Sequence, residues 1–215
     1  PYGLNATKML AGRAAELGVV VISGGARGCD AAAHEAALAA GGQTVAFLGG
    51  GCDEPYPKSN VDLFRRIVKG GGAVASEFPW HYPPKPFMFR KRNRLIAGLA
   101  RATLIVEAGL PSGTFSTADE ALAANKDVLA VPGSIFSATS AGSNMLLAQG
   151  AMPIVSKEVF DSAIMSLFPE IVGGGYGAEQ LALFAGVGAD AGVDDPILSA
   201  LAADPMRLEE IIALF

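Results

Sequence analysis

Two segments of this sequence carry residue types that are suited to holding an anion. One is the glycine-rich turn at residues 23–30, which follows an apolar run directly. Glycine lets backbone N–H groups come close to a ligand, and a helix that starts there adds free N–H donors and a positive dipole end. The other is the basic run at residues 89–94, in a chain that is otherwise acidic. Together they indicate a ligand that bears phosphate, and a polymer more than a single nucleotide.

Aromatic residues accompany the basic run. The cations are Lys85, Arg90, Lys91, Arg92 and Arg94, and no acidic residue lies between them. The neighbouring aromatic residues are Trp80, Tyr82, Phe87 and Phe89. Cations that follow a backbone, together with aromatic faces for the bases, are typical of a site for single-stranded nucleic acid. An isolated run of this kind is more often a solvated helix start, but its expected place at the carboxyl end of a strand favours binding.

Length and composition indicate one large domain with some chain left over. The chain has 215 residues, of which 51% are hydrophobic and 17% charged, as in a globular protein with a large core. The net charge of -5 repels nucleic acid in general, so any such contact requires a local basic patch. Cys29 and Cys52 are predicted to be free thiols in a reducing, cytoplasmic setting. No apolar stretch is long enough to cross a membrane, and no secretion signal opens the sequence.

Apolar periodicity predicts that strands and helices alternate. We expect strands at residues 19–23, 44–48, 73–77, 103–107, 128–131 and 152–155, and helices at residues 6–17, 30–40, 61–69, 92–99, 114–124 and 144–149. Such alternation predicts an α/β, Rossmann-like, doubly wound fold with a mostly parallel sheet and helices on both faces. Ligands of such folds bind at the carboxyl ends of the strands. The glycine turn and the basic run both fall there.

The predicted organisation has three parts. Residues 1–172 form the Rossmann-like domain. Residues 173–193 are rich in glycine and alanine, lack periodicity, and are predicted to be a linker. Residues 194–215 contain two short amphipathic patterns that are too short for a core of their own.

The motifs of nucleotide cofactors and of metals are incomplete. The glycines are Gly24, Gly25 and Gly28, which do not have the G-x-G-x-x-G spacing, and no Gly-Lys-Ser/Thr follows them. His34 and Glu35 lack the second histidine of a zinc motif, and no cysteine and histidine cluster has ligand spacing. We therefore predict no cofactor, no metal site and no catalytic residue.

Two further turns fall at the same edge of the expected sheet. One contains Ser112, Gly113 and Thr114, whose hydroxyls can cap the next helix or donate to a phosphate. The other, at residues 140–144, contains Asn144. Several small, polar turns along one edge predict a cleft.

Taken in order, these motifs resemble the DNA-processing protein A family, also called DprA or Smf. The motifs are Ser23-Gly24-Gly25-Ala26-Arg27-Gly28-x-Asp30-x-x-Ala33-His34, Asp53-Glu54-Pro55-Tyr56-Pro57-x-x-Asn60, Ser76-Glu77-Phe78-Pro79, Arg92-Asn93-Arg94-x-Ile96-Ala97-Gly98-Leu99, Val106-Glu107-Ala108, Ser112-Gly113-Thr114, Val131-Pro132-Gly133 and Ser140-x-Gly142-x-Asn144. The resemblance covers about residues 1–160. The ordered set is specific, although each motif alone is weak.

The resemblance implies a Rossmann-like protein that binds single-stranded DNA and loads the recombinase RecA onto it during natural transformation. It implies a homodimer and no chemical step. The residues that it implies for nucleic acid binding are Gly24, Gly25, Arg27, Gly28, Phe89, Lys91, Arg92, Asn93, Arg94, Ser112, Gly113, Thr114 and Asn144. Among these, Arg27 and the arginines of the basic run would hold phosphates, and Phe89 would offer a stacking surface.

Some residues depart from the family pattern. Cys29 stands where an apolar residue is usual, and Asp119 and Glu120 stand where an arginine and an apolar residue are more common. The two acids lower the positive charge near the turn at Ser112. The tail from Asp194 resembles the beginning of the winged-helix domain of many family members, and the sequence ends at Phe215.

Two other functions stay open at this point. The first is an enzyme of the phosphoribohydrolase type, since Gly113, Thr114 and Glu120 are similar to its Gly-Thr turn and glutamate. That family has Pro-Gly-Gly where this chain has Leu110-Pro111-Ser112. The second is a structural or partner-binding module, which leaves the basic run without a role.

Overall fold

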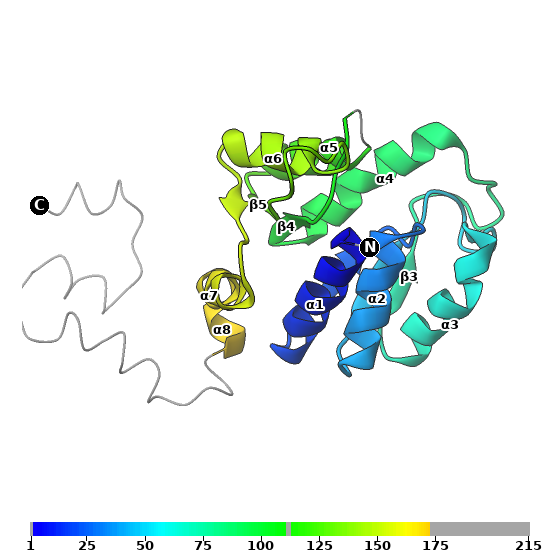
Figure 1. The fold of residues 1–215 in the computed structure, drawn as a ribbon. Coiled ribbons are helices and arrows are strands. Elements are labelled where there is room, and N and C mark those ends of the chain that lie inside the picture. The colour runs from blue at the N-terminus through cyan, green and yellow to red at the C-terminus, as the bar shows by residue number, and fades with distance from the viewer. Residues whose placement is uncertain (1, 111–112, 173–215) are drawn as a thin grey trace, which may run out of the picture. The chain divides into compact units, whose positions relative to one another are not determined.

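The computed structural model describes residues 2–110 and 113–172. The chain divides into a unit of residues 1–172 and a unit of residues 173–215. The linker predicted at residues 173–193 and the winged-helix-like segment predicted at residues 194–215 lie outside the described residues, as does Ser112. Figure 1 shows the described helices and strands.

The strands alternate with helices along the chain, as the periodicity predicts. The elements are α1 (Tyr2–Glu16), β1 (Val21–Ser23), α2 (Cys29–Ala39), β2 (Thr44–Phe47), the 3-10 turn η1 (Lys58–Asn60), α3 (Val61–Lys69), β3 (Ala73–Ala75), α4 (Pro86–Leu99), β4 (Ala102–Ile105), α5 (Thr114–Ala123), β5 (Asp127–Ala130), α6 (Ala141–Ala148), β6 (Met152–Pro153), α7 (Lys157–Leu167) and α8 (Pro169–Val172). All the strand pairs found among the described residues are parallel. The predicted α/β class is confirmed.

The strands are hydrogen-bonded as two sheets. One has the order β1-β2-β3 and the other the order β4-β5-β6. Within the described residues no ladder joins β1 to β4, whereas we expected one sheet. Because β1 and β4 border the same cleft, the strand order read across the two sheets is 3-2-1-4-5-6, as in a Rossmann fold.

Alternating side chains of β4 and β5 pack against helices on both faces of their sheet. Leu104 and Leu129 point to a core that α1 and α7 complete, with Leu10 and Phe160 among its members. Their neighbours in sequence contribute to a second core with α4, α5 and α6. A third core joins β2 to α2 and α3. Since successive strand residues face opposite sides, this pattern shows helices on both faces.

The largest differences from the helices predicted by the sequence are in α4 and α7. α4 begins at Pro86 rather than at Arg92, so the basic run lies within a helix and not before it. Proline is favoured in a first helical turn because its missing N–H is not needed there. α7 was not predicted, and Ser156 caps it by accepting a hydrogen bond from the N–H of Val159 at 3.3 Å.

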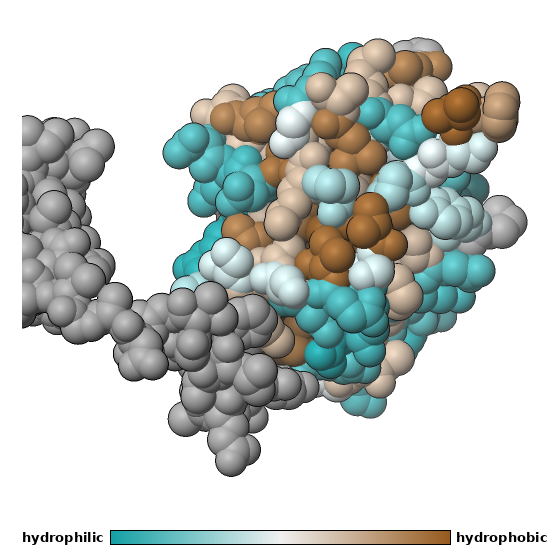
Figure 2. All heavy atoms as spheres, turned by 60° about the vertical axis from the view of Figure 1, so that its left-hand side comes forward, coloured by the Kyte–Doolittle hydropathy of each residue, from teal (hydrophilic) through white to brown (hydrophobic). Residues whose placement is uncertain are grey.

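Large apolar side chains also reach the surface. On the face drawn in Figure 2, hydrophobic residues lie in patches between hydrophilic ones. Scattered exposed apolar residues are ordinary in folded proteins. Exposure alone therefore does not mark a site.

Candidate functional site

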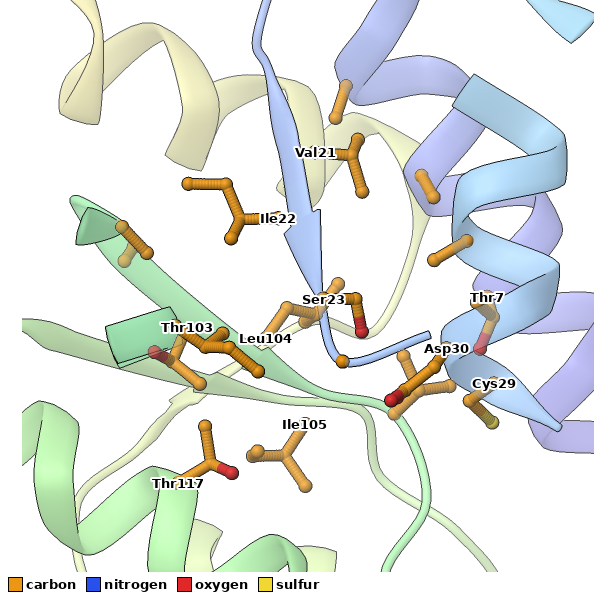
Figure 3. Close-up of a pocket in the computed structure, with 18 of the residues that line it drawn as sticks. Thr7, Val21, Ile22, Ser23, Cys29, Asp30, Thr103, Leu104, Ile105 and Thr117 are labelled. Atoms are coloured by element: carbon orange, nitrogen blue, oxygen red, sulfur yellow. The ribbon is translucent and has the colours of Figure 1, made fainter. Parts of the chain in front are cut away.

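A cleft of about 1090 Å³ opens between β1 and β4 and reaches the carboxyl ends of both strands. Figure 3 shows Ile22 of β1 on one side of it, Thr103 and Leu104 of β4 on the other, and Asp30 near the end of β1. Seven of the predicted site residues line this cleft: Gly24, Arg27, Phe89, Arg92, Asn93, Gly113 and Thr114. Arg90 of the basic run lines it as well, whereas Lys91 does not. The predicted convergence of turn and basic run at one edge is thus present.

The glycine turn is shaped by close packing and by backbone conformation. A Cβ atom on Gly24 would lie 2.4 Å from the guanidinium nitrogens of Arg92. Gly25 has φ +64° and faces the ring of Phe64, which would lie 2.5 Å from an added Cβ. Gly28 has φ +88° and precedes α2, which has no side-chain cap. The turn therefore presents an uncapped helix start to solvent, with Arg27 exposed beside it.

Three exposed arginines line the cleft: Arg27, Arg90 and Arg101, of which Arg101 pairs with Glu170. Arg27 and Arg90 are the two near the glycine turn and the basic run. Within the described residues, neither Arg27 nor Arg90 forms an ion pair. Asp30, the nearest acid in sequence, accepts a hydrogen bond from the backbone N–H of Ala26 at 3.2 Å. The carboxylate thus braces the turn, and the two arginines keep their charge available for an anion.

Arg92 is buried, with 5% of its surface exposed. Its Nη1 donates to the carbonyl oxygen of Gly24 at 2.7 Å and to that of Phe47, so it ties the ends of β1 and β2 to α4. Burial lowers the pKa of the Arg92 guanidinium, and the charge of Asp30 opposes that shift. Arg92 therefore braces the inner wall of the cleft.

Asn93 is buried beside Arg92. Its Nδ2 donates to the hydroxyl of Ser116 at 2.7 Å, and its Oδ1 accepts from the Nε of Arg92 at 3.2 Å. These bonds attach α4 to the first turn of α5. Asn93 thus positions the Gly113 turn, to whose carbonyl oxygen it also donates at 3.4 Å.

A single carboxylate pairs with the other two cations of the basic run. Glu77, just beyond β3, forms ion pairs with Arg94 and, at 3.8 Å, with Lys91. The ammonium group of Lys91 also lies 5.4 Å from the centre of the Phe78 ring. Lys91 and Arg94 therefore reach the surface partly neutralised, and neither is among the residues that line the cleft.

Phe89 packs beside the carboxyl end of β2. Its ring lies 2.7 Å from where a Cβ on Gly49 would be, and its centre is 5.6 Å from that of Tyr56. One face of Phe89 is thus held by the protein. Tyr56 is half exposed at the same place.

The remaining predicted residues have different surroundings. Gly113 and Thr114 line the cleft at the start of α5. Asn144 uses both ends of its amide on Gly133, accepting from its N–H and donating to its carbonyl oxygen, each at 3.0 Å. Asn144 therefore fastens the loop after β5 to α6. Glu120, which the phosphoribohydrolase alternative requires, is not among the lining residues.

His34 lies away from the cleft and is fully buried. Its Nδ1 is 2.7 Å from the hydroxyl of Thr44, which donates in turn to the carbonyl oxygen of Val21 at 2.6 Å. Because the hydroxyl proton is used on Val21, His34 must donate from Nδ1, and its buried Nε2 has no hydrogen-bond partner. Burial lowers the pKa of His34 to about 4, although Asp30 acts in the opposite direction.

Neither a metal cluster nor a membrane span is found within residues 2–110 and 113–172. No group of three or more His, Cys, Asp or Glu side chains there could hold a metal ion. No helix in the same residues is both long and apolar enough to cross a bilayer.

Residues 1–164 match the model of a protein family described as DNA recombination-mediator protein A. This match covers most of the chain, including β1, β4 and the glycine turn and basic run that border the cleft. The chain belongs to this family. The DprA/Smf resemblance carried by its motifs is thereby confirmed.

Individual relatives agree with this assignment. The chain is 47% identical over 150 residues to a DNA processing protein DprA of Mycobacterium tuberculosis, which is 70% of this chain and 38% of that protein. The chain thus spans less than half the length of that relative. Among solved structures, DprA of Streptococcus pneumoniae has a TM-score of 0.68 at 37% identity, over 74% of this chain and 56% of that one. DNA processing protein A of Helicobacter pylori, studied for its single-stranded DNA binding mode, has a TM-score of 0.70 at 31% identity, over 77% of this chain and 75% of that one.

Proposed function

We propose that this chain binds single-stranded DNA in the cleft between β1 and β4 as part of a recombination mediator. The observation that carries the proposal is the pair of exposed arginines, Arg27 and Arg90, which form no ion pair within residues 2–110 and 113–172, beside the start of α2, which has no side-chain cap. In a chain of net charge -5, such local charge attracts a polyanion that the rest of the surface repels. The binding mode described for the Helicobacter pylori relative supports the choice of single strands.

We further propose that a homodimer of this protein delivers the bound strand to the recombinase RecA in the cytoplasm, without a chemical step. Membership of a family of recombination mediators supports this assignment. Lys91, Arg94, Gly25 and Gly28 are proposed as outer contacts of the same strand.

Replacement of Arg27 by alanine is expected to weaken the binding of a labelled oligo-dT by about tenfold or more at low salt, since one phosphate contact is lost. Fluorescence anisotropy over a salt series measures the affinity and its salt dependence. The logarithm of the affinity should fall less steeply with the logarithm of salt, by roughly 0.7 for each contact removed.

Arg65→Ala is the matched control, because Arg65 is also an exposed arginine but lies on α3 and pairs with Asp62 at 2.9 Å. It should bind as the unchanged protein does. If the folded protein does not bind oligo-dT at low salt, or if both variants lose the same affinity, the cleft is not the binding site.

Glu77→Gln is expected to strengthen DNA binding by about tenfold, because it frees Lys91 and Arg94 for one or two further phosphates. The glutamine side chain keeps an oxygen that can accept a hydrogen bond from Arg94, so the position of that arginine is retained. The same anisotropy titration should show a steeper salt dependence. Asp62→Gln is the control, because Asp62 pairs with Arg65 on the same helix, α3. It should change neither the affinity for DNA nor its salt dependence. Weaker binding by Glu77→Gln would show that the carboxylate orients the cations rather than competing for them.

A further inference from the structure

A rigid loop beside the basic run carries exposed aromatic side chains. It comprises residues 78–85, between β3 and α4, and is continued by the first turn of α4. We propose that Trp80 and Phe87 form a stacking surface for the bases of the single strand whose phosphates the cleft holds. The inference rests on the proposed function and extends the site beyond the cleft, because neither residue lines it.

The loop is fixed by the three glycines that follow β2. Phe89 lies against Gly49, Pro84 against Gly50, and the carbonyl groups of Pro79 and Trp80 against Gly51, where an added Cβ would lie about 2 Å from them. The N–H of Gly51 donates to the carbonyl oxygen of Tyr82 at 2.8 Å. The consecutive glycines therefore serve to seat the loop, since any side chain at Gly51 would displace its backbone.

Further hydrogen bonds hold the first part of the loop. The N–H of Asp53 donates to the carbonyl oxygen of Trp80 at 3.0 Å. The hydroxyl of Ser76 donates to the carbonyl oxygen of Gly50 at 2.7 Å and accepts from the N–H of Phe78 at 3.0 Å. The backbone of Trp80 is thus anchored while its indole is left outside. A surface ordered before binding loses less entropy when a ligand arrives.

The side chains of Trp80 and Phe87 are exposed, and neither stacks on another aromatic ring of the described residues. Trp80 is 68% exposed and Phe87 59% exposed. Within the described residues the ring pairs are Tyr56 with Phe89 and Phe78 with Tyr82, so Trp80 and Phe87 stack on nothing. Large aromatic rings held rigidly in water mark a binding surface more than a packing defect.

The surrounding charge favours a nucleic acid over an apolar protein partner. Lys85 lies 5.3 Å from the centre of the Tyr82 ring, and Lys91 and Arg90 follow on α4. The acids nearby are engaged: Glu77 with Lys91 and Arg94, and Asp53 with His81 at 3.3 Å. Alternating cations and free aromatic faces are what a sugar-phosphate backbone with unpaired bases requires. The occupant we assign is therefore a run of bases in single-stranded DNA.

The intrinsic fluorescence of the protein tests this directly, because Trp80 is the only tryptophan of the chain. Oligo-dT should quench it as it binds, and the quenching curve should follow the anisotropy of a labelled strand. An abasic strand of the same length, which has phosphates but no bases, should bind more weakly and leave the fluorescence nearly unchanged. Phe87→Ala should lower the affinity for oligo-dT by about tenfold without changing its salt dependence, since stacking releases no counterions.

Leu122→Ala is the control for lost apolar surface, because Leu122 on α5 is equally exposed at 59%. It should bind as the unchanged protein does. Tight binding of oligo-dT without quenching, or equal quenching by the abasic strand, would overturn the proposal and leave this surface to a protein partner. Absence of any anisotropy change at low salt would instead refute DNA binding by the cleft.

Discussion

Replacement of Arg92 by alanine is expected to lower the free energy of unfolding by about 3–5 kcal/mol. The guanidinium is almost fully buried and donates to two carbonyl oxygens, those of Gly24 and Phe47. Its removal leaves both acceptors without a donor and opens a void between α4 and the two strand ends. Urea denaturation followed by circular dichroism at neutral pH gives the difference.

Two variants sharpen this result. Arg90→Ala changes an exposed arginine two residues away on the same helix, and should alter the free energy of unfolding by less than about 0.5 kcal/mol. Gly24→Ala would place a methyl group 2.4 Å from the guanidinium nitrogens and so should displace Arg92. The losses caused by Gly24→Ala and Arg92→Ala should then be far from additive in the double variant. Equal stability of Arg92→Ala and Arg90→Ala would contradict the bracing role.

This role bears on how binding data are interpreted. A variant of Arg92 that fails to bind DNA has lost the wall of the cleft, so its failure does not identify a phosphate contact. Arg27 and Arg90 are the informative positions, because each is exposed and neither supports the fold through an ion pair within the described residues. The binding role predicted for Arg92 stays a prediction that its own substitution cannot test alone.

The spacing of residues in α4 indicates that Arg92 is buried, although an arginine is ordinarily expected at the surface. Pro86 marks a helix start, and from there Met88, Arg92, Asn93 and Ala97 recur at helical spacing on the buried face of α4. Periodicity counted over apolar residues alone omits an arginine from that face. The start expected at Arg92 therefore cut the pattern in two, and the cations were all assigned to the surface.

Other features depend on contacts that no local pattern encodes. The motif order and the alternation of strands and helices placed the turn and the basic run at one edge, and the cleft lies there. The neutralisation of Lys91 and Arg94 by Glu77 joins the end of β3 to α4, and only the fold brings them together. The structure uses Gly49, Gly50 and Gly51 to seat an aromatic loop. Glycine in a turn indicates that another group comes close to the backbone, but it does not tell whether that group belongs to a ligand or to the protein itself.

The stability of the protein is expected to fall as the pH decreases from neutral, because of His34. Its pKa is about 4 in the folded protein and about 6.5 in the unfolded chain. Below about pH 6.5 the unfolded chain therefore binds a proton that the folded protein does not accept until about pH 4. The free energy of unfolding should drop by about 2 kcal/mol between about pH 7.5 and about pH 5, and by about 3 kcal/mol once the pH reaches the folded pKa.

Urea denaturation over this pH range, on the unchanged protein and on two variants, isolates the effect. The chain has two histidines, and His81 is exposed beside Asp53. His34→Gln should lower stability at neutral pH, because the buried bond to Thr44 is disturbed, but should remove most of the fall down to about pH 5. His81→Gln should keep that fall. If both variants have the same pH dependence as the unchanged protein, carboxylates and not the buried imidazole govern its acid sensitivity. Since His34 joins α2 to β2 and Asp30 on the same helix braces the glycine turn, the loss of structure should start at the helix that borders the cleft.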